Sequence, residues 1–473
     1  MPEAPDHATD LLEKMDAAGV AKLHWRIMFI SGMGFFTDAY DLFIIGVVLS
    51  LLSEQWRISP TAEGLVTSTA LLASAFGAVA FGRVADMLGR KRIYGYEVLV
   101  LAVGAIASAL SPNIWWLIFF RIILGVGVGG DYPVSSTIMS EYAGKKSRGM
   151  LVTLVFTMQA AGLIFGPLLA AALLWSGLSH DLVWRLLLGF GAVPALAVFR
   201  MRRHMVETPR YLLASGQHDA FSDAATQILG QLAGAGGGGP VRDQTAMKPA
   251  EPFWRGFQLL IRERVFVIRL IGAGLAWFLM DFAYYGNTVS SPMVLKAITP
   301  DQDVMTHTLM QLAVFVVAAA PGYLLAAAMM DRMGRKSIQV LGFAMMAASF
   351  AAIALIPGVE RLVVPFLVTY GISYFFTEFG PNSTTFLYPA EIFPGKARAT
   401  GHGIAAAAGK LGGFLGVFLF PIFMSWNGLL AAESAAAIAS LLGIVVTVWM
   451  LPETKGLSLE ELARERLPKA ASA

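Results

Sequence analysis

The sequence predicts an all-α membrane protein in which twelve transmembrane helices form two pseudo-symmetric six-helix halves. Of the 473 residues, 56% are hydrophobic and only 14% are charged, which is more apolar sequence than a soluble core of this length requires. The apolar residues fall into successive stretches, each near the ~20 residues that a helix needs to cross a bilayer. Short loop motifs also recur at nearly constant spacing along the chain.

The expected spans begin after a polar segment, residues 1–24, that lacks the cationic start and cleavage site of a signal peptide. They cover residues 26–52, 62–86, 93–111, 114–140, 148–176 and 182–201, and then 266–291, 305–330, 337–357, 361–389, 399–425 and 428–451. The chain thus divides into an N-terminal tail (1–24), a first half (25–201), a linker (202–262), a second half (263–451) and a C-terminal tail (452–473). The glycine-rich run at 233–240 predicts a flexible linker rather than a third domain.

Basic residues gather in alternate loops between these spans. The loops concerned contain Arg90, Lys91, Arg92, Lys145, Lys146, Arg148, Arg202, Arg203, Arg210, Arg332, Arg335, Lys336, Lys396 and Arg398. Cytoplasmic loops of membrane proteins carry an excess of Lys and Arg. We therefore expect both termini to be cytoplasmic, in a multi-pass protein of the plasma membrane.

The two halves also form a repeat. The segment GRVADMLGRKR at 82–92 returns as AAMMDRMGRKS at 327–337, an offset of 245 residues. At offsets of 246 and 250 residues, Glu207-Thr208 returns as Glu453-Thr454, and Glu141 with Arg148 returns as Glu391 with Arg398. Parallel halves related about the membrane normal are typical of transporters that bind substrate between the halves, near the middle of the bilayer.

These motifs resemble those of a known family over essentially the whole chain. GRVADMLGRKR resembles the loop signature of the major facilitator superfamily, with Met87 where an Arg is usual. ETPR at 207–210 and PETKG at 452–456 are similar to the ends of the two halves in sugar porters. GGDYPVSSTIMSEYA at 129–143 is similar to the signature of the phosphate:proton symporter family, and departs from it at Val134 and Ser136. The resemblance implies the major facilitator fold.

Two glycine motifs resemble patterns that are typical of other functions. The glycines at 125, 127 and 130 form a GxGxxG, but no strand precedes them, so close helix packing is favoured over a dinucleotide site. GLIFGP at 162–167 matches part of an antiporter pattern whose last two glycines are replaced by Ala170 and Ala171. The replacement favours symport over exchange.

Asp131 and Tyr132 lie inside an apolar run. An intramembrane carboxylate costs about 2.5 to 3.5 kcal/mol on insertion scales, so a functional role is favoured over a structural one. Neighbouring residues on a helix point about a hundred degrees apart. We expect Tyr132 to face the central cavity and Asp131 to face its own half, towards Asp38 or Asp41.

A stripe on the seventh span points to the substrate. Trp277, Asp281 and Tyr285 are spaced at i, i+4 and i+8 and share one face, whereas Tyr284 points away. An aromatic packing face would explain the rings but not the carboxylate. Neutral donors bind an oxyanion and release it more readily than an Arg clamp. The expected substrate-binding residues, which converge if the halves pack as the resemblance implies, are Tyr132, Gln159, Trp277, Asp281, Tyr285 and Asn382.

Carboxylates near this site are candidates for proton coupling. A bound anion favours a proton on Asp281, and Asp38, Asp41 and Asp131 extend a path towards the cytoplasm. The alternative for Asp38 and Asp41 is a polar bend in the first helix. Lys410 is interpreted as a counter-ion to one of these carboxylates, with a substrate contact as the alternative. Glu378 stands where the phosphate family more often has an amide, which makes it a selectivity candidate.

Charged residues at the cytoplasmic helix ends predict a gate. Partly desolvated ion pairs there could hold the inner side shut, whereas the alternative is ordinary topogenic charge. The candidate gate residues are Asp86, Arg90, Glu141 and Arg148 in the first half, and Asp331, Arg335, Glu391 and Arg398 in the second.

These features predict a transporter. The sequence contains no cysteine, no nucleophile with a base and no P-loop, so we expect no enzyme activity, no cofactor and no metal site, and an ion gradient must supply the energy. The resemblance implies a proton-coupled symporter that imports an oxyanion, inorganic phosphate first, by alternating access. An organic anion or sugar-like solute is the alternative on the same fold, and a non-transporting sensor is the alternative of another class. The expected partners are the anion, protons and the lipid bilayer, without nucleic acid, and a monomer is expected to function.

Overall fold

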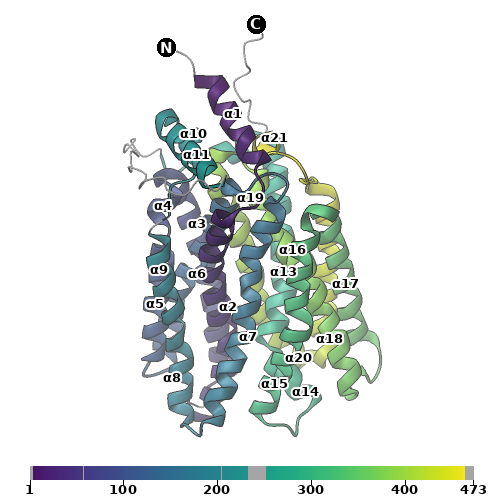
Figure 1. Cartoon of the computed structure of the whole chain (residues 1–473). Coiled ribbons are helices and arrows are strands. Elements are labelled where there is room, and N and C mark those ends of the chain that lie inside the picture. The colour runs from purple at the N-terminus through teal and green to yellow at the C-terminus, as the bar shows by residue number, and fades with distance from the viewer. Residues whose placement is uncertain (1–3, 57, 204, 233–251, 464–473) are drawn as a thin grey trace.

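The computed structural model describes residues 4–56, 58–203, 205–232 and 252–463, and within these ranges all regular structure is helical. The glycine-rich run at 233–240 and the end of the predicted C-terminal tail, 464–473, lie outside the described residues. The helices form an elongated bundle with both termini at one end (Figure 1). The predicted all-α membrane fold is confirmed.

The first half contains six crossings, two of which are broken in two. They are α2 (Lys22–Trp56), α3 (Pro60–Leu88), α4 (Arg90–Ile93) with α5 (Tyr96–Ala109), α6 (Ile114–Tyr142), α7 (Arg148–Trp175), and α8 (His180–Phe190) with α9 (Ala192–Arg202). Ser59 caps α3 and Asn113 caps α6, each accepting a hydrogen bond from a backbone N–H of the first turn.

The second half repeats this arrangement with more interruptions. Its helices are α13 (Arg264–Val289), α14 (Ser291–Ile298), α15 (Val304–Val314), the π-helical turn η1 (Phe315–Ala319), α16 (Ala320–Met333), α17 (Arg335–Leu355), the 3-10 turn η2 (Val359–Arg361), α18 (Val363–Thr377), the π-helical turn η3 (Glu378–Asn382), α19 (Ser383–Ile392), the 3-10 turn η4 (Gly395–Ala397) and α20 (Arg398–Met450).

Ten helical stretches of the described chain are long and apolar enough to cross a membrane. One of them, 395–450, crosses twice, because its helical backbone breaks at Asn427 and Gly428, where φ is −151° and +56°. A further crossing, α18–η3–α19, is divided by the π-helical turn, in which Gly380 leaves helical geometry. The described residues therefore contain the twelve predicted crossings.

Glycines allow the helices to approach closely. A Cβ at Gly125 would lie 2.2 Å from the carbonyl oxygen of Ala70, and one at Gly127 would lie 2.5 Å from the backbone nitrogen of Leu101. These glycines of α6 therefore let it pack on α3 and α5, which confirms the packing interpretation of the GxGxxG motif. The halves meet where α3 packs against α20 and where α7 packs against α16.

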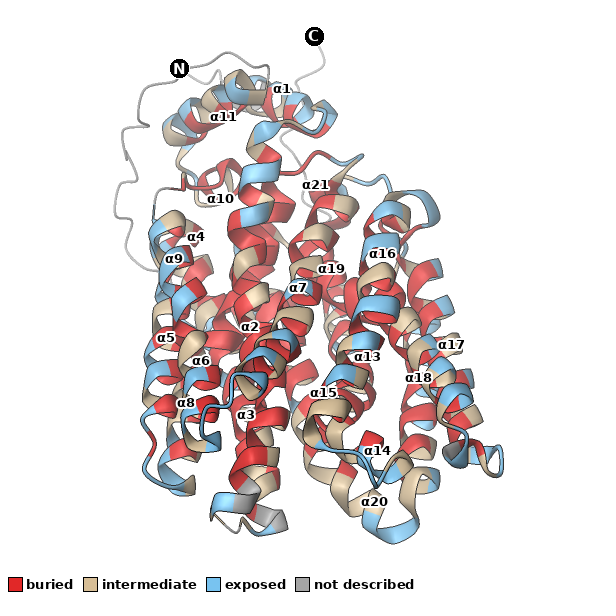
Figure 2. Ribbon diagram, turned by 60° about the horizontal axis from the view of Figure 1, so that its bottom comes forward, coloured by how far each residue is buried: buried red, intermediate tan, exposed pale blue. Residues whose placement is uncertain are grey.

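The outer surface of the bundle is apolar. Large hydrophobic side chains such as Phe76, Val317 and Trp449 are 70%, 75% and 82% exposed, and exposed positions follow the outward faces of the helices while buried ones face inward (Figure 2). A soluble monomer seldom exposes so much contiguous apolar surface, so these faces contact lipid. The chain is an integral, multi-pass membrane protein.

Short helices cover the end of the bundle where the termini lie (Figure 1). They are α1 (Ala4–Ala17), α10 (Pro209–Ala214), α11 (His218–Leu232), α12 (Arg255–Arg262) and α21 (Leu459–Ala463). α1 packs on α11, and α21 packs on α19. The segments predicted as tails and a flexible linker therefore contain helices wherever they are described.

Candidate functional site

An ion pair lies at the centre of the bundle, between the two halves. Nζ of Lys410, on α20, is 3.2 Å from Oδ2 of Asp281 on α13 and donates a 2.8 Å hydrogen bond to the hydroxyl of Tyr285. The same ammonium lies 4.2 Å from the ring centroid of Tyr132, on α6 of the other half. All four side chains are buried. The stripe expected on the seventh span thus faces a lysine of its own half and a tyrosine across the interface.

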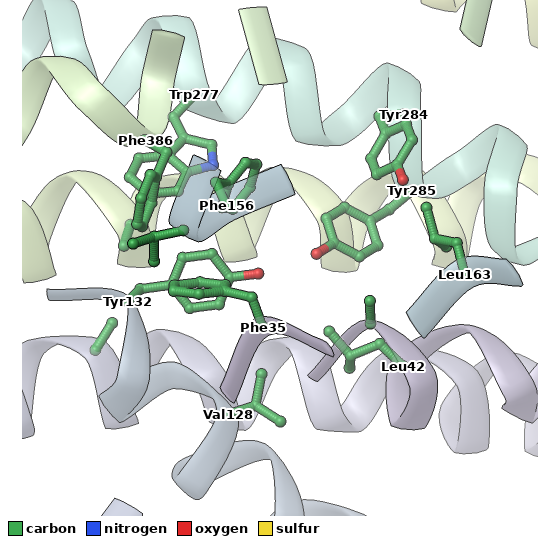
Figure 3. Packing of buried hydrophobic residues seen from close by; sticks show 14 of the residues in the cluster. Phe35, Leu42, Val128, Tyr132, Phe156, Leu163, Trp277, Tyr284, Tyr285 and Phe386 are labelled. Atoms are coloured by element: carbon green, nitrogen blue, oxygen red, sulfur yellow. The ribbon is translucent and has the colours of Figure 1, made fainter. Parts of the chain in front are cut away.

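Aromatic rings from both halves pack around this site, and Figure 3 shows how those of Tyr132, Trp277 and Phe386 lie. The ammonium of Lys410 is 4.2 and 4.6 Å from the ring centroids of Tyr132 and Tyr285. The ring of Tyr132 lies 5.1 Å from that of Phe35 and 5.9 Å from that of Trp277. Phe386 and Phe156 stack at 4.5 Å beside them. A low-dielectric wall of this kind strengthens electrostatic interactions inside it.

A chain of neutral hydrogen-bonding groups leads away from Tyr132. Its hydroxyl accepts a 3.1 Å hydrogen bond from Nε2 of Gln159, whose Oε1 accepts one of 2.9 Å from Tyr323 of α16. Nδ2 of Asn382 donates to the Tyr323 hydroxyl at 2.8 Å and to Oε2 of Glu378 at 2.5 Å. The chain therefore crosses from the first half into the second. We call these residues, together with Trp277, Asp281, Tyr285 and Lys410, the central cluster.

Asp38 and Asp41 lie on α2, completely buried, and none of their carboxylate oxygens has a hydrogen-bond partner. Asp38 is within electrostatic range of Asp41, Asp131 and Lys410. Arg121 lies beside Asp41 and donates from Nη1 to its backbone carbonyl at 2.9 Å. Two buried carboxyl groups without partners stand between the central cluster and the interior of the first half.

Asp131 belongs to a separate arrangement inside the first half. Arg202 grips its carboxylate with both terminal nitrogens, at 2.8 and 2.9 Å, and Nη1 of the same arginine is 2.7 Å from Oε1 of Glu97. Ser135 donates to Asp131 at 2.5 Å. Asp131 does face its own half while Tyr132 faces the centre. Its partner, however, is an arginine that sequence reasoning placed in the linker. We call Glu97, Asp131 and Arg202 the buried triad.

The candidate gate residues form a network at the end of the bundle near the termini. Asp86 of the first half accepts hydrogen bonds from the backbone nitrogens of Ala399 and Thr400 of the second, at 3.3 and 2.7 Å. Asp331 of the second half accepts from the backbone nitrogens of Gly149 and Met150 of the first, at 3.1 and 2.8 Å. Each aspartate therefore ties its half to the N-terminus of a helix in the other, where helix dipoles favour anions.

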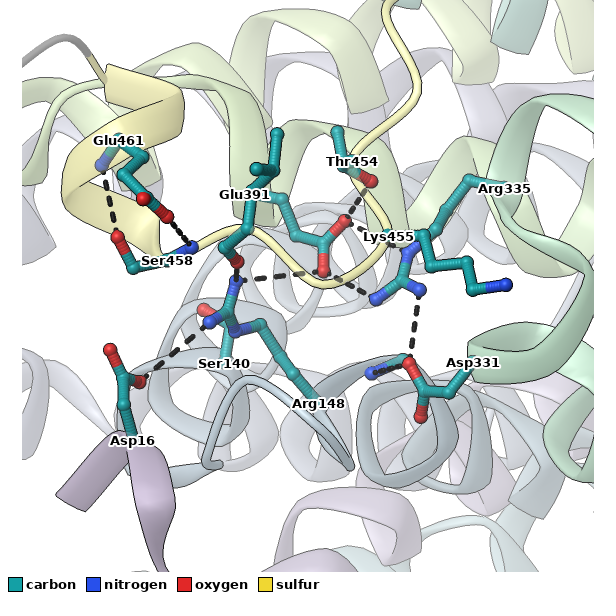
Figure 4. Close-up of polar contacts among 12 residues, drawn as sticks. Asp16, Ser140, Arg148, Asp331, Arg335, Glu391, Thr454, Lys455, Ser458 and Glu461 are labelled. Carbon is teal, nitrogen blue, oxygen red and sulfur yellow. Dashed lines mark hydrogen bonds and ion pairs between the residues drawn. The ribbon is translucent and has the colours of Figure 1, made fainter. Parts of the chain in front are cut away.

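Two glutamates complete this network in the same paired way. Glu141 accepts from Arg90 of its own half at 3.2 Å and from Arg398 of the other at 3.0 Å. Glu391 pairs with Arg335 of its own half at 2.8 Å and with Arg148 of the other at 3.8 Å, as Figure 4 shows. We call the eight candidate gate residues the gate network. They hold the halves together at this end.

The N-terminal tail, the linker and the C-terminal tail contact one another beside the gate network, where Asp16 lies 3.9 Å from Arg148. Arg210 of α10 is 2.7 Å from Asp16 of α1 and forms an ion pair with Glu460 of α21. Although burial raises the pKa of Glu460, the Arg210 guanidinium outweighs that effect and lowers the pKa to about 2. Burial raises the pKa of Glu207, just after α9, to about 7 against the opposing charge of Arg90.

The sugar (and other) transporter family matches residues 27–465 of this chain. The chain belongs to this family of the major facilitator superfamily. It is 34% identical to inorganic phosphate transporter 1-1 of Oryza sativa subsp. japonica, with 96% of each chain covered. It is also 34% identical to the probable inorganic phosphate transporter 1-6 of Arabidopsis thaliana, with 98% of each covered.

Solved structures of XylE from E. coli share the fold. The proton:xylose symporter XylE bound to a bromo-deoxy-glucose matches with a TM-score of 0.77 at 19% identity, covering 93% of this chain and 98% of that one. The predicted membership of the major facilitator superfamily, and within it of the phosphate:proton symporter family, is confirmed. Members of this family are transporters, so the chain is a transporter and not an enzyme.

Sequence reasoning missed three members of these clusters. Tyr323 lies in an apolar run with no charged neighbour, so no local pattern marks it. Arg202 and Arg203 together look like loop charge, yet only Arg203 is exposed. Glu97 follows the basic loop at 90–92 closely enough to look interfacial, but its side chain is completely buried. A carboxylate at the start of a membrane span is the one sequence feature that could have marked Glu97 as a buried, interacting residue.

Proposed function

We propose that this chain is a proton-coupled symporter that imports inorganic phosphate by alternating access. The observation that carries the proposal is the buried Lys410–Asp281 ion pair, enclosed by neutral donors from both halves. Relatives described as inorganic phosphate transporters, matched over almost the full chain, support phosphate as the substrate.

The central cluster offers a phosphate anion one positive charge and several neutral donors. Lys410 supplies the charge, and its ammonium already has two oxygen partners, Asp281 and Tyr285. A phosphate oxygen can replace these partners. Hydroxyl, amide and indole groups then bind the remaining oxygens without adding fixed charge. The donors proposed are Tyr132, Gln159, Trp277, Tyr285 and Asn382, with Tyr323 holding Gln159 in place.

Coupling to protons follows from charge balance at the same site. The Lys410–Asp281 pair is neutral as a unit, and an entering anion makes the site negative in a low-dielectric surrounding. A proton on Asp281 restores neutrality and frees Lys410 for phosphate. Binding of the anion and of the proton therefore favour each other, which is the requirement for symport.

Asp38 and Asp41 are proposed to carry the proton away from the central cluster. Their carboxylate oxygens have no hydrogen-bond partners, so nothing fixes their charge state through a direct contact. Asp131 is proposed as the last group of this path. Since Arg202 holds both of its oxygens, Asp131 can take part only when that ion pair loosens, and this ties the path to movement of the half.

Alternating access needs a closed end and an end that can open. We propose that the gate network closes the cytoplasmic end, because the loops rich in Lys and Arg and both termini lie there. The plasma membrane is the proposed location. All members of the central cluster come from one chain, so a monomer is sufficient for transport.

One observation favours a second candidate substrate. Glu378 lies in the central cluster, hydrogen-bonded to Asn382, and a second carboxylate disfavours a small anion when it is ionised. An organic anion or sugar-like solute that presents a hydroxyl to Glu378 would fit the same site. Competition of labelled-phosphate uptake by unlabelled phosphate, sulfate, glycerophosphate and simple carboxylates distinguishes these candidates, and Glu378→Asn should strengthen phosphate relative to larger solutes.

Uptake of labelled phosphate into proteoliposomes, with and without an inward proton gradient, tests the proposed function. We expect wild-type protein to accumulate phosphate only with the gradient, and Asp281→Asn to lose this accumulation while still exchanging phosphate. Asp301→Asn makes the same chemical change at an exposed loop position and should leave uptake unchanged. Gradient-driven accumulation at the wild-type level by Asp281→Asn would refute the coupling role of Asp281.

A further inference from the structure

The second half contains a further buried carboxyl group, at the end of the bundle away from the termini. Glu433 lies just after the break in α20, completely buried, and its Oε1 has no hydrogen-bond partner. Its Oε2 accepts a 3.4 Å hydrogen bond from Nδ2 of Asn287 on α13. An ionised carboxylate in this position would have one weak neutral contact to compensate for the loss of water.

The groups that face Glu433 are all uncharged. α13 presents Asn287, and α18 presents Tyr370, whose hydroxyl donates to the Asn287 carbonyl at 3.2 Å. α17 carries no ionisable side chain between 338 and 355. Among the described residues, no Lys, Arg or His forms an ion pair or hydrogen bond with Glu433.

A group of hydroxyls lies between Glu433 and the centre, beyond the Asn287 amide that contacts Glu433. The hydroxyls of Tyr370 and Tyr374 are 3.2 Å apart, and each is 3.2 Å from Oγ of Ser291. Tyr284 packs edge-on against Tyr374, with ring centroids 6.3 Å apart, and its hydroxyl has no hydrogen-bond partner. Figure 3 shows Tyr284 on the same helix as Tyr285, to one side of the aromatic enclosure.

Beyond these hydroxyls lies Glu378, the second carboxyl group with a free oxygen. Tyr370, Tyr374, Glu378 and Asn382 are spaced four residues apart and so follow one face of the tenth crossing. Oε1 of Glu378 has no hydrogen-bond partner. The ionisable groups near it are Tyr284 and Asp281 of α13 and Tyr323 of α16, none of them cationic. Glu378 is the first residue of the π-helical turn η3, and such turns are local irregularities often found at functional sites.

We propose that Glu433 and Glu378 form a second proton-carrying pair, in addition to Asp281, that delivers one proton per cycle from the end of the bundle opposite the termini to the central cluster. This inference rests on the proposed function. In each transfer an O–H bond breaks at Glu433 and one forms at Glu378, while each hydroxyl between them accepts one proton and releases its own. Glu433 and Tyr284 have no hydroxyl partner in this conformation, so the transfer requires movements during the cycle that bring these groups into hydrogen-bond contact. Glu378 then meets substrate in its neutral form, which removes its conflict with an anion.

A structural role predicts a different behaviour. Glutamine keeps the shape of a protonated glutamate and can accept the same hydrogen bond from Asn287. If Glu433 only fills space, Glu433→Gln should leave every property of transport unchanged. If it carries a proton, the same variant should fold and transport phosphate with fewer protons.

The test measures charge moved and labelled phosphate taken up in the same proteoliposomes, across a range of external pH. We expect Glu433→Gln and Glu378→Gln each to lower the number of protons per phosphate by about one and to flatten the pH dependence, with the double variant resembling either single one. Glu433→Asp should restore the wild-type ratio, and Asp301→Asn is the matched control. An unchanged ratio and pH profile in Glu433→Gln would overturn the proposal. Loss of a sodium-driven component in that variant would also overturn it in favour of a cation site.

Infrared difference spectra of phosphate binding supply a readout that does not depend on transport. Protonation of Asp281 gives one carboxylic-acid C=O band, which should be present in the wild type and in both variants. We expect the wild type to show a second such band that is lost in Glu433→Gln and in Glu378→Gln, and persistence of this second band in both variants would contradict the proposal. If Glu433→Gln does not yield folded protein, the same band is compared in two other variants. It should be present in Glu433→Asp and absent in Glu378→Gln. A wild type that takes up no phosphate would refute the proposed function instead, so the two failures are distinguishable.

Discussion

The gate network and the central cluster use the repeat in opposite ways. At the gate, both copies keep the same residue types, so Asp86 and Asp331 each bind the start of a helix in the other half. At the centre, corresponding positions differ: 250 residues after Tyr132 comes Asn382, and 250 after Ala160 comes Lys410. Matched contacts suit the proposed role of the gate network in closing the halves, whereas the proposed binding of one small solute at the centre is served by different groups on each side.

The buried triad also has no counterpart in the second half, and this difference bears on the stability of the two halves. Position 381, which corresponds to Asp131 at the same offset, is a proline, so the second half has no equivalent ion pair there. The two halves should therefore respond differently to the removal of buried charge.

The largest expected effect is on the free energy of unfolding, when Arg202 is removed from the buried triad. Arg202→Met leaves Asp131 and Glu97 buried without their counter-charge, so we expect a loss of about 3–5 kcal/mol in the free energy of unfolding. Denaturant unfolding of purified protein in nanodiscs measures it. Arg203→Met, the same change at the exposed neighbouring position, should cost little. Equal losses in both variants would contradict the structural importance of the triad.

The ion pair of Glu460 with Arg210 should produce the next largest effect, and only in acid. The folded-state pKa of Glu460, about 2, is below its usual value of 4.5, so the pair stabilises the fold fully above pH 4.5. This contribution, about 3 kcal/mol, is lost as pH falls from 4.5 towards 2. Unfolding measured against pH should show this loss in wild type and in the exposed-site control Glu13→Gln, but not in Glu460→Gln.

The gate twins should behave alike. Asp86→Asn and Asp331→Asn each weaken a charged hydrogen bond between the halves, so each should favour opening of this end by about 1–2 kcal/mol. Because the chain has no cysteine, spin labels on single cysteines at the exposed positions Lys146 and Lys396 report the distance between the halves. A shift in only one of the two variants would break the equivalence of the two copies.

The smallest expected effect concerns a single neutral donor. Tyr132→Phe should weaken phosphate binding by about 1 kcal/mol while leaving the pH dependence of uptake in place, because every carboxyl group remains. Isothermal titration of phosphate measures the affinity. Tyr96→Phe, in a partly exposed ring, provides the control, and an unchanged affinity in Tyr132→Phe would remove that hydroxyl from the site.

The fold and the gate network could be predicted from the sequence because both depend on repetition. Apolar length defines the crossings, and motifs that recur after about 250 residues mark contacts that occur twice. Helical spacing also placed Trp277, Asp281 and Tyr285 on one face. The sequence also contains a pattern that predicts helix α11, because its buried residues are at helical spacing: Phe221, Ala224, Ala225 and Ile228. The neighbouring glycine run, however, favours a flexible segment.

Contacts that occur once could not be predicted in the same way. The hydrogen bonds of Tyr323, the grip of Arg202 on Asp131 and the burial of Glu433 depend on how particular faces of distant helices meet. In a membrane span, an apolar pattern does not distinguish a lipid-facing side from a buried one. The hydrogen-bond partners within the central cluster therefore become visible only once the helices are packed in three dimensions.

The central claim is that phosphate and a proton bind together through Asp281 and Lys410. Calorimetric titration of phosphate in buffers with different heats of ionisation counts the protons taken up on binding. We predict that the wild type takes up about one proton per phosphate more than Asp281→Asn, which should still bind phosphate. Equal proton uptake by the two proteins, or none by the wild type, would contradict the account.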